Sequence, residues 1–250
     1  MILITRLLAP SLKLDPNDKD YPFSVKPDTL VTLEALIDVF RDYYEGTPFD
    51  MTKNIKVTDK DGKSIISPLA SPHMPYDAND LYGVNGGWNE LGERTIARWY
   101  TMYATIIQLR NWLPDEIGGV EWLAMDNVAT SIYVPIYGCV TDLPSQYKTP
   151  GRINGYSLES AWWIFNRLGT LTSQRWGDMR HDVDAVWIPM QKQLIDEQKD
   201  VDQQALELYH RNKKSAIEFL NEYSNEEGEK VMKEAIKLGD FLWTKYDEKF

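Results

Sequence analysis

The sequence predicts an α+β protein, with a small antiparallel sheet in its first half and helices in its second half. Three segments rich in β-branched and aromatic residues follow one another closely; they are 101–109, 120–125 and 132–140. Their connections are short, so we expect an antiparallel meander over about 100–140. Beyond residue 156 apolar residues recur at helical spacing, which predicts a helical region over 156–250.

A helix is also predicted near the start, over 28–45, where apolar residues recur at spacings of three and four. Pro27 and Asp28 suit its beginning, and Gly46 suits the position just past its end. From Thr47 to Glu93 the periodicity breaks. A segment of that length in a compact domain is usually functional or packed on the surface.

Proline and a capping pattern predict details of these elements. Pro135 within the third strand favours an edge position or a bulge, because proline cannot donate to a sheet ladder. Pro189 should kink or end the helix that contains it. Ser224 and Glu227 have capping-box spacing, which predicts the start of the last helix.

Composition and charge limit the classes of partner. The 250 residues are 43% hydrophobic, which indicates a folded globular protein. The net charge of −11 disfavours binding to nucleic acid or to anionic membrane surfaces, since such binding relies on Lys and Arg. No apolar run reaches the roughly 18 residues that a membrane span needs. We expect neither nucleic acid nor membrane as a partner.

Motifs for common chemistries are missing or ambiguous. The sequence has no Gly-rich nucleotide loop, no Walker lysine and no Gly-x-Ser-x-Gly elbow, so we expect no cofactor. Cys139 is the one thiol; it lies in a predicted strand among apolar neighbours, which favours a buried structural role. Asp178, His181 and Asp182 share a helical face that a metal-dependent hydrolase would use, but a salt-bridged surface is the favoured reading.

Aromatic residues in the helical region allow two readings. They are Trp162, Trp163, Phe165, Trp176 and Trp187. They could form a sugar-binding platform, or they could pack the helices against the sheet; packing is the favoured interpretation.

A polar pair, Asp126 and Asn127, ends the second predicted strand. An Asn amide donates a hydrogen bond without carrying charge, which suits an oxyanion. Asp and Asn are also common in turns where strands stop. An oxyanion-binding amide and an ordinary turn therefore both remain open as interpretations of this pair.

Several linked motifs resemble one family. They are "YEGTPFDMTK" (44–53), "ERTIARWYTMYATIIQLRNWLPDEIGGVEWLAMDN" (93–127), "VPIYGCVTDLPSQYKTPG" (134–151) and "WIFNRLGTLTSQRWGDMRHDV" (163–183). Together they are similar to the later part of the cysteine dipeptidases of the dipeptidase A type, which are N-terminal nucleophile hydrolases. The resemblance runs in order from about residue 28 to about residue 210.

The resemblance implies an αββα sandwich and hydrolysis of dipeptides by an N-terminal cysteine. The thiolate of that residue attacks the peptide carbonyl, while its free α-amine carries the proton. This chain begins with Met1, and the internal Cys139 has no free amine. We therefore expect a single domain, 1–250, that is the C-terminal portion of a larger peptidase and is inactive by itself. The alternative is a non-catalytic binding or scaffold module.

The resemblance also suggests site residues and partners. Asn127 is the oxyanion candidate, and Asp50, Thr52, Arg94 and Asp126 are candidates for binding the substrate. The implied partners are a dipeptide and the missing N-terminal segment of the same protein. The strands left unpaired by its absence should favour self-association, so we expect homo-oligomers. An exported parent protein fits the resemblance, with a cytoplasmic one as the alternative.

Overall fold

The computed structural model describes residues 2–15, 20–73 and 95–248. Their elements, in chain order, are α1 (Ile2–Leu8), α2 (Leu33–Arg41), β1 (Lys56–Thr58), β2 (Ser64–Ile66), β3 (Tyr103–Leu109), α4 (Asp115–Gly118), β4 (Gly119–Met125), the 3-10 helix η1 (Val128–Thr130), β5 (Val134–Tyr137), α5 (Ser145–Lys148), the 3-10 helix η2 (Arg152–Asn154), α6 (Ala161–Gln174), α7 (Trp176–Arg211) and α8 (Lys213–Asp247). No helix in these ranges has the length and apolar character needed to cross a membrane.

The antiparallel meander is confirmed as a sheet of order β3-β4-β5. Its register aligns Ile106 with Trp122, and Trp122 with Pro135. Pro135 therefore lies on an edge strand, as predicted. The third strand ends at Tyr137 rather than at residue 140.

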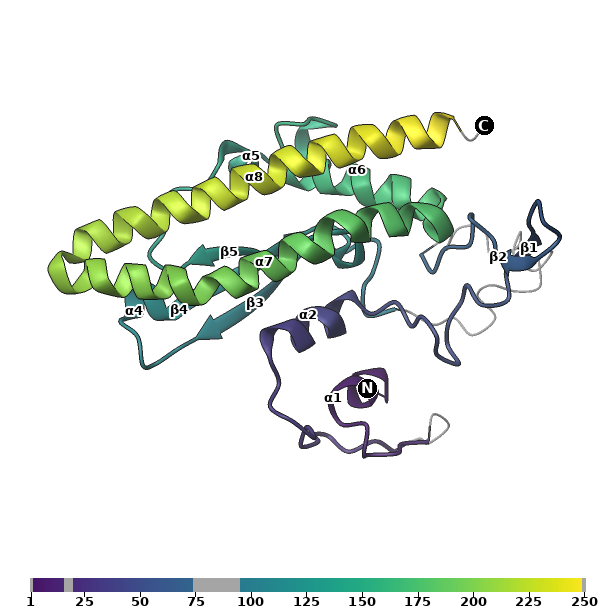
Figure 1. Cartoon of the computed structure of the whole chain (residues 1–250), viewed down its shortest axis with the longest axis horizontal. Coiled ribbons are helices and arrows are strands. Elements are labelled where there is room, and N and C mark those ends of the chain that lie inside the picture. Colours follow the sequence, from purple (N-terminus) through teal and green to yellow (C-terminus); the bar gives the residue numbers. More distant parts are fainter. Residues whose placement is uncertain (1, 16–19, 74–94, 249–250) are drawn as a thin grey trace.

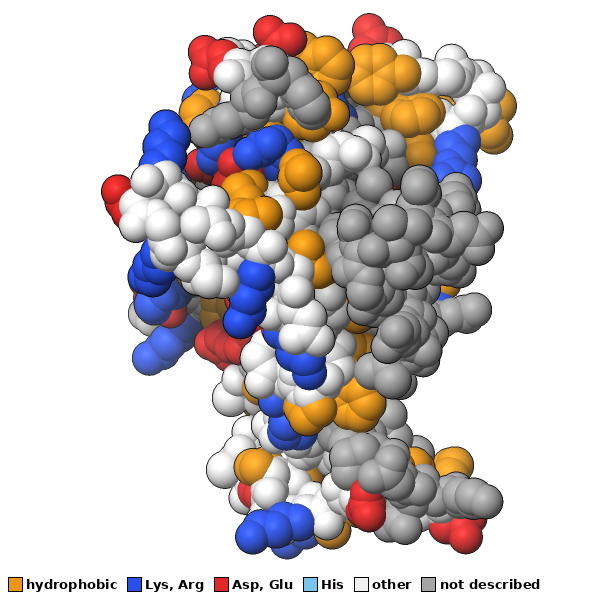
Figure 2. Space-filling view, turned by 90° about the vertical axis from the view of Figure 1, so that its right-hand side faces the viewer, with side chains coloured by type: hydrophobic (Ala, Val, Ile, Leu, Met, Phe, Trp, Pro, Cys, Tyr) orange, Lys and Arg blue, Asp and Glu red, His pale blue; other side chains and the backbone are white. Residues whose placement is uncertain are grey.

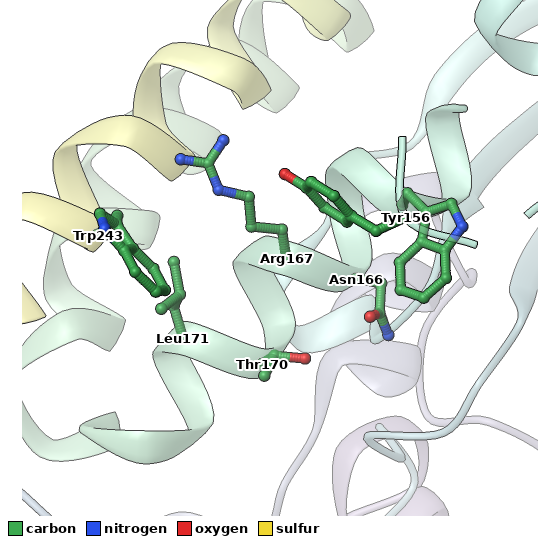
Figure 3. A pocket seen from close by; sticks show the side chains of 7 residues that line it. Tyr156, Asn166, Arg167, Thr170, Leu171 and Trp243 are labelled. Carbon is green, nitrogen blue, oxygen red and sulfur yellow. The ribbon is translucent and has the colours of Figure 1, made fainter. Parts of the chain in front are cut away.

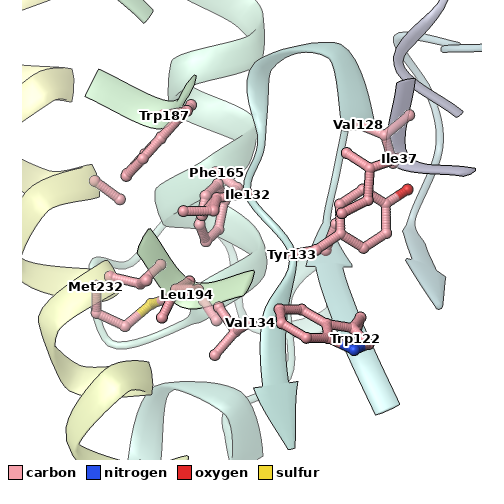
Figure 4. Packing of buried hydrophobic residues seen from close by; sticks show 14 of the residues in the cluster. Ile37, Trp122, Val128, Ile132, Tyr133, Val134, Phe165, Trp187, Leu194 and Met232 are labelled. Carbon is pink, nitrogen blue, oxygen red and sulfur yellow. The ribbon is translucent and has the colours of Figure 1, made fainter. Parts of the chain in front are cut away.

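Helices α6, α7 and α8 lie along one side of this sheet (Figure 1). β4 alternates strictly, and its buried residues Val120, Trp122 and Ala124 belong to the main core. Figure 4 shows helix side chains such as Phe165 and Trp187 packed in this core. The helical second half and the α+β class are thus confirmed.

The aromatic residues of the helices form core rather than a platform. Trp162, Phe165, Trp176 and Trp187 are all buried. Trp163 is half-buried, and its indole nitrogen donates to the Gly151 carbonyl at 2.7 Å. The favoured packing interpretation therefore holds.

The other face of the sheet is open along β3. The side chains of Tyr103, Ile107 and Leu109 are 63%, 61% and 78% exposed. Their β4 neighbours on this face include Leu123 and Met125, which are half-buried. Because strand side chains alternate between faces, burial of one set on the helix side directs these residues to the outer side.

The N-terminal segment lies apart from the sheet. α1 contacts α2, and the chain around α1 lies below α2 (Figure 1). The molecule narrows where this segment meets the body (Figure 2).

The first predicted helix is shorter than expected. α2 begins at Leu33, because the Thr32 hydroxyl caps it by accepting from the Ala35 N–H at 3.2 Å. It ends at Arg41, and Asp42 is already extended. The prediction of a helix over 28–45 with Gly46 as its terminator was therefore wrong at both ends.

The predicted start of the last helix was wrong, and of the two outcomes predicted at Pro189, a kink or an end, the structure excludes the end. α7 does not end at Pro189 but runs through it to Arg211. Ser224 and Glu227 lie inside α8, whose start is capped by Asn212 instead. The Ser224 hydroxyl is buried and accepts from the Tyr137 N–H at 3.4 Å, so it binds a backbone group of the edge strand β5.

Two tryptophans test the core. Trp122→Ala should lower the free energy of unfolding by about 3–5 kcal/mol, because the fully buried indole leaves a cavity in the core. Trp112→Ala is the matched control; that indole is 75% exposed, so the change should stay within about 0.5 kcal/mol. Urea unfolding followed by circular dichroism measures both. Equal losses in the two variants would show that the sheet is not packed as described.

Candidate functional site

The end of β4 forms a buried polar corner. Asp126 and Asn127 follow the strand directly and are 2% and 1% exposed. Asp126 has a positive φ of 58°, which Asp adopts more readily than most residues. Its N–H donates to the Met102 carbonyl at 3.0 Å. The sharp turn aims both side chains into the interior between the sheet and α6.

The Asp126 carboxylate is held by α6. Its Oδ1 accepts from Asn166 Nδ2 at 3.0 Å. A Cβ added at Gly169 would lie 2.8 Å from its Oδ2, so glycine is needed for α6 to approach this closely. Burial raises the pKa of Asp126 to about 6, against the smaller opposing effects of its hydrogen bonds and of Arg152.

Asn127 acts as a cap through its side-chain oxygen and leaves its side-chain nitrogen without a partner. Its Oδ1 accepts from the Ala129 N–H at 3.0 Å and so caps η1, which is a turn function. Its Nδ2 is buried and has no hydrogen-bond partner within the described ranges. A donor left unsatisfied in this way is available for an acceptor that a ligand brings.

A pocket of about 500 Å³ lies next to the corner. It is lined by Tyr156, Trp163, Asn166, Arg167, Thr170, Leu171 and Trp243. Figure 3 shows Tyr156, Arg167 and Trp243 around it. Arg167 is paired with Asp240 at 2.5 Å. Asn166 belongs to the pocket wall and also holds Asp126, so it connects the two.

The other substrate-binding candidates lie elsewhere or outside the described residues. The Asp50 carboxylate accepts from the Gly46 N–H at 3.0 Å and from the Thr52 N–H and hydroxyl at 2.8 and 2.7 Å. These bonds close the turn of the "YEGTPFDMT" segment and do not reach Asp126 or Asn127. Arg94 lies outside the described residues.

The candidate metal face is a salt-bridged surface. Asp178 pairs with Arg175 at 3.0 Å, and Asp182 pairs with Lys245. His181 is exposed. Within the part of the chain that the structure covers, no three His, Cys, Asp or Glu side chains are grouped to hold a metal.

Cys139 lies in the turn after β5, not inside the strand as predicted. It is half-buried, and this burial raises the pKa of its thiol. A raised pKa lowers the fraction of thiolate, which is the nucleophilic form. The structural interpretation of this residue is therefore favoured.

Sequence reasoning missed a buried charged cluster beside the corner. Arg180 of α7 donates to the Ala129 carbonyl and pairs with Asp184 at 2.8 Å. Its guanidinium also lies over the rings of Tyr43 and Trp176, 5.6 and 5.3 Å from their centroids. No local pattern signals this cluster, because its members come from segments far apart in the chain.

Comparison with known proteins points to one family. The family described as Peptidase family C69 matches residues 2–188. The probable dipeptidase B of Lactococcus lactis subsp. lactis (strain IL1403) is 24% identical over 68% of this chain and 28% of its own length. The dipeptidase A of Lactobacillus helveticus is 26% identical over 67% of this chain and 28% of its own length.

A third relative gives the same picture. The probable dipeptidase of Latilactobacillus sakei is 23% identical over 72% of this chain and 31% of its own length. The chain thus spans less than a third of each of these three relatives.

The raised pKa of Asp126 predicts a pH dependence of stability. As the pH rises from about 4 to about 6, the unfolded chain loses this proton before the folded protein does, so folding is weakened. The shift from 3.8 to about 6 corresponds to roughly 3 kcal/mol. Asp126→Asn keeps the acceptor for Asn166 and removes the charge. Between pH 4 and pH 6 the unfolding free energy of the variant, relative to that of the parent, should therefore rise by roughly 3 kcal/mol.

Urea unfolding at pH 4 and pH 7 measures the difference. A stability difference between variant and parent that is the same at both pH values would contradict the shifted pKa.

Proposed function

Because the chain belongs to peptidase family C69, we propose that it is the C-terminal part of a cysteine dipeptidase that hydrolyses dipeptides. The relatives that it resembles are named dipeptidases, and the family match covers residues 2–188. Since the chain spans less than a third of these relatives, the proposed activity is that of the whole protein.

The open face of the sheet is the structural observation that carries this proposal. β3 presents Tyr103, Ile107 and Leu109 to solvent on a sheet whose other face contributes to the main core. Apolar surface of this kind marks an interface. In the proposed parent protein a second sheet, from the N-terminal part of the same protein, packs on it at about 10 Å. Without that sheet, the same face favours self-association.

The proposed nucleophile is an N-terminal cysteine in the part of the protein that this chain does not span. Its thiolate attacks the peptide carbonyl, and its α-amine passes the proton to the leaving amine. Water then hydrolyses the thioester. Cys139 does not fit this role, because its nitrogen is in a peptide bond and its thiol pKa is raised.

Asn127 is proposed to stabilise the oxyanion. The tetrahedral intermediate places a negative charge on the former carbonyl oxygen, which a neutral amide donor stabilises. The unpartnered Nδ2 of Asn127 supplies such a donor, while its Oδ1 keeps the side chain oriented by capping η1.

Two substitutions at this position separate the oxyanion role from the capping role. Asn127→Asp keeps an acceptor for the Ala129 N–H but removes the NH₂ donor, whereas Asn127→Ala removes both. In the complete protein both variants should lower kcat by about 10²–10³-fold. Asn127→Ala should in addition lose about 1 kcal/mol of stability with the cap. Asn127→Asp should lose stability at neutral pH for another reason, because it buries a second carboxylate beside Asp126. Steady-state kinetics with a dipeptide and urea unfolding measure these effects. Full activity of Asn127→Asp would mean that the residue acts only as a cap.

The location of the nucleophile is tested by comparing this chain with the complete protein. The 250-residue chain alone should not hydrolyse Ala-Leu, whereas the complete protein should. Cys139→Ala in the complete protein should leave turnover unchanged, since that thiol is structural. Release of free amino acids measures turnover. Hydrolysis by the chain alone that survives Cys139→Ala would exclude a nucleophile outside it.

A further inference from the structure

A second hollow, of about 350 Å³, lies between α2 and α7. Its size is within the range of small-molecule sites, roughly 300–1,000 Å³. From α2 it is lined by Ile37, Asp38 and Arg41, and from α7 by Ile188 and Gln191 among others. The two helices therefore form a groove with apolar and charged walls.

Arg41 lies at one end of the groove and has side-chain nitrogens without a hydrogen-bond acceptor. Its Nε and Nη2 are buried without a hydrogen-bond partner, and it makes no ion pair with the described part of the chain. Burial, together with the nearby positive charge of Arg180, lowers the pKa of Arg41 to about 10, so it is charged at neutral pH. A buried, unpaired guanidinium is unfavourable. A carboxylate would satisfy it through two parallel hydrogen bonds.

The described part of the chain places carboxylates near Arg41 but forms no ion pair with it. Arg41 and Arg180 both interact with Asp184, but Asp184 lies 2.8 Å from Arg180 and forms its ion pair there. Asp38, one turn before Arg41, also acts on it electrostatically, but within the described residues neither carboxylate forms an ion pair with Arg41. The Tyr133 hydroxyl, which interacts with Arg41, is also buried without a partner and points toward Ile37 of α2 (Figure 4). This end of the groove therefore has donors in excess and attracts an anion.

The other end of the α2 wall is acidic. Asp38 precedes Arg41 by one turn, and Glu34 precedes Asp38 by another. Neither carboxylate has a cation within ion-pair distance among the residues that the structure describes, whereas Asp196 across the groove is paired with Lys192. Burial raises the pKa of Asp38, with Glu34 adding to the effect of burial and Arg41 opposing it. A ligand ammonium would favour the charged form of this carboxylate.

The spacing of these opposite charges matches a small zwitterion. Side chains three residues apart on a helix start about 5–6 Å from each other. The termini of an extended dipeptide are separated by about 7 Å, at about 3.3–3.6 Å per residue. Ile37 and Ile188 lie on the facing walls and offer apolar contact to the ligand's side chains.

We propose that this groove binds the charged termini of a dipeptide, with Arg41 holding the α-carboxylate and Asp38 holding the α-ammonium. This inference rests on the proposed function and assigns the substrate termini to residues other than Asp50 and Arg94. Gln191 supports the groove, because its amide binds both the N–H and the carbonyl of Tyr133, at 2.8 and 3.1 Å.

Three ligands and two variants test the assignment by calorimetric titration of the 250-residue chain. The ligands are Ala-Leu, its C-terminal amide and its N-acetyl form. Loss of either terminal charge should weaken binding by about tenfold or more, as expected for loss of a charge-assisted hydrogen bond. Arg41→Gln should weaken Ala-Leu binding by a similar factor but leave binding of the amide unchanged. Asp38→Asn should weaken Ala-Leu binding but leave binding of the N-acetyl form unchanged.

Lys214→Gln is the matched control, because Lys214 is exposed on α8 and lines neither pocket. Its affinity for Ala-Leu should stay within about twofold of the parent, a difference well below 1.4 kcal/mol. Circular dichroism verifies the folding of every variant. If the isolated chain is unfolded, the same titrations are made on the complete protein after its thiols are alkylated with iodoacetamide.

Equal affinities for the three ligands, no binding of Ala-Leu at millimolar concentration, or full affinity of Arg41→Gln would each overturn the assignment. Because the readout is binding, it is separate from turnover. If the complete protein hydrolyses Ala-Leu but the titrations show no binding in the groove, only the groove assignment is rejected. If the titrations show binding but the complete, unmodified protein does not hydrolyse Ala-Leu, the dipeptidase proposal is rejected.

Discussion

Burial of one face of β4 is the constraint on which the rest of this structure depends. Val120, Trp122 and Ala124 are at most 1% exposed, and they pack in the core formed with α6, α7 and α8. Burying a side chain as large as Trp122 contributes about 3 kcal/mol or more. Because side chains alternate along a strand, this face fixes which residues point away from the helices. The outward direction of Tyr103, Ile107 and Leu109 on β3 is a direct consequence.

α7 then fixes the irregular segment between β4 and β5. Trp187 Nε1 donates to the Thr130 carbonyl at 3.0 Å, and Gln191 binds both backbone groups of Tyr133. Arg180, about two turns before Trp187 along the helix, donates to the Ala129 carbonyl. A loop in the interior needs such partners, since its backbone groups have no ladder to satisfy them. The position of Asn127 follows from these bonds.

The same framework explains why the two chemically distinct regions lie where they do. The Asp126 corner forms where β4 stops and α6 passes close by at Gly169. The α2–α7 groove forms where α2 packs against η1 and faces α7. Both regions hold buried polar groups that the chain satisfies only in part. Such groups are rare in folded proteins and are characteristic of sites where a ligand completes the bonding.

The sequence alone determined the three strands of the β3-β4-β5 sheet, the edge position of Pro135 and the helical second half, because periodicity and turn residues act over a few positions. Linked motifs carried the family resemblance. The β1-β2 pair was not predicted, since it lies in the segment where the periodicity breaks. The sequence misplaced the α2 boundaries and the capping box, since Ser224 and Glu227 have the same spacing inside a helix as at its start. Only the tertiary structure brought Arg41 to Arg180 and Asn166 to Asp126. These contacts join separate elements, and their burial and unmet hydrogen bonds arise only when the helices pack on the sheet.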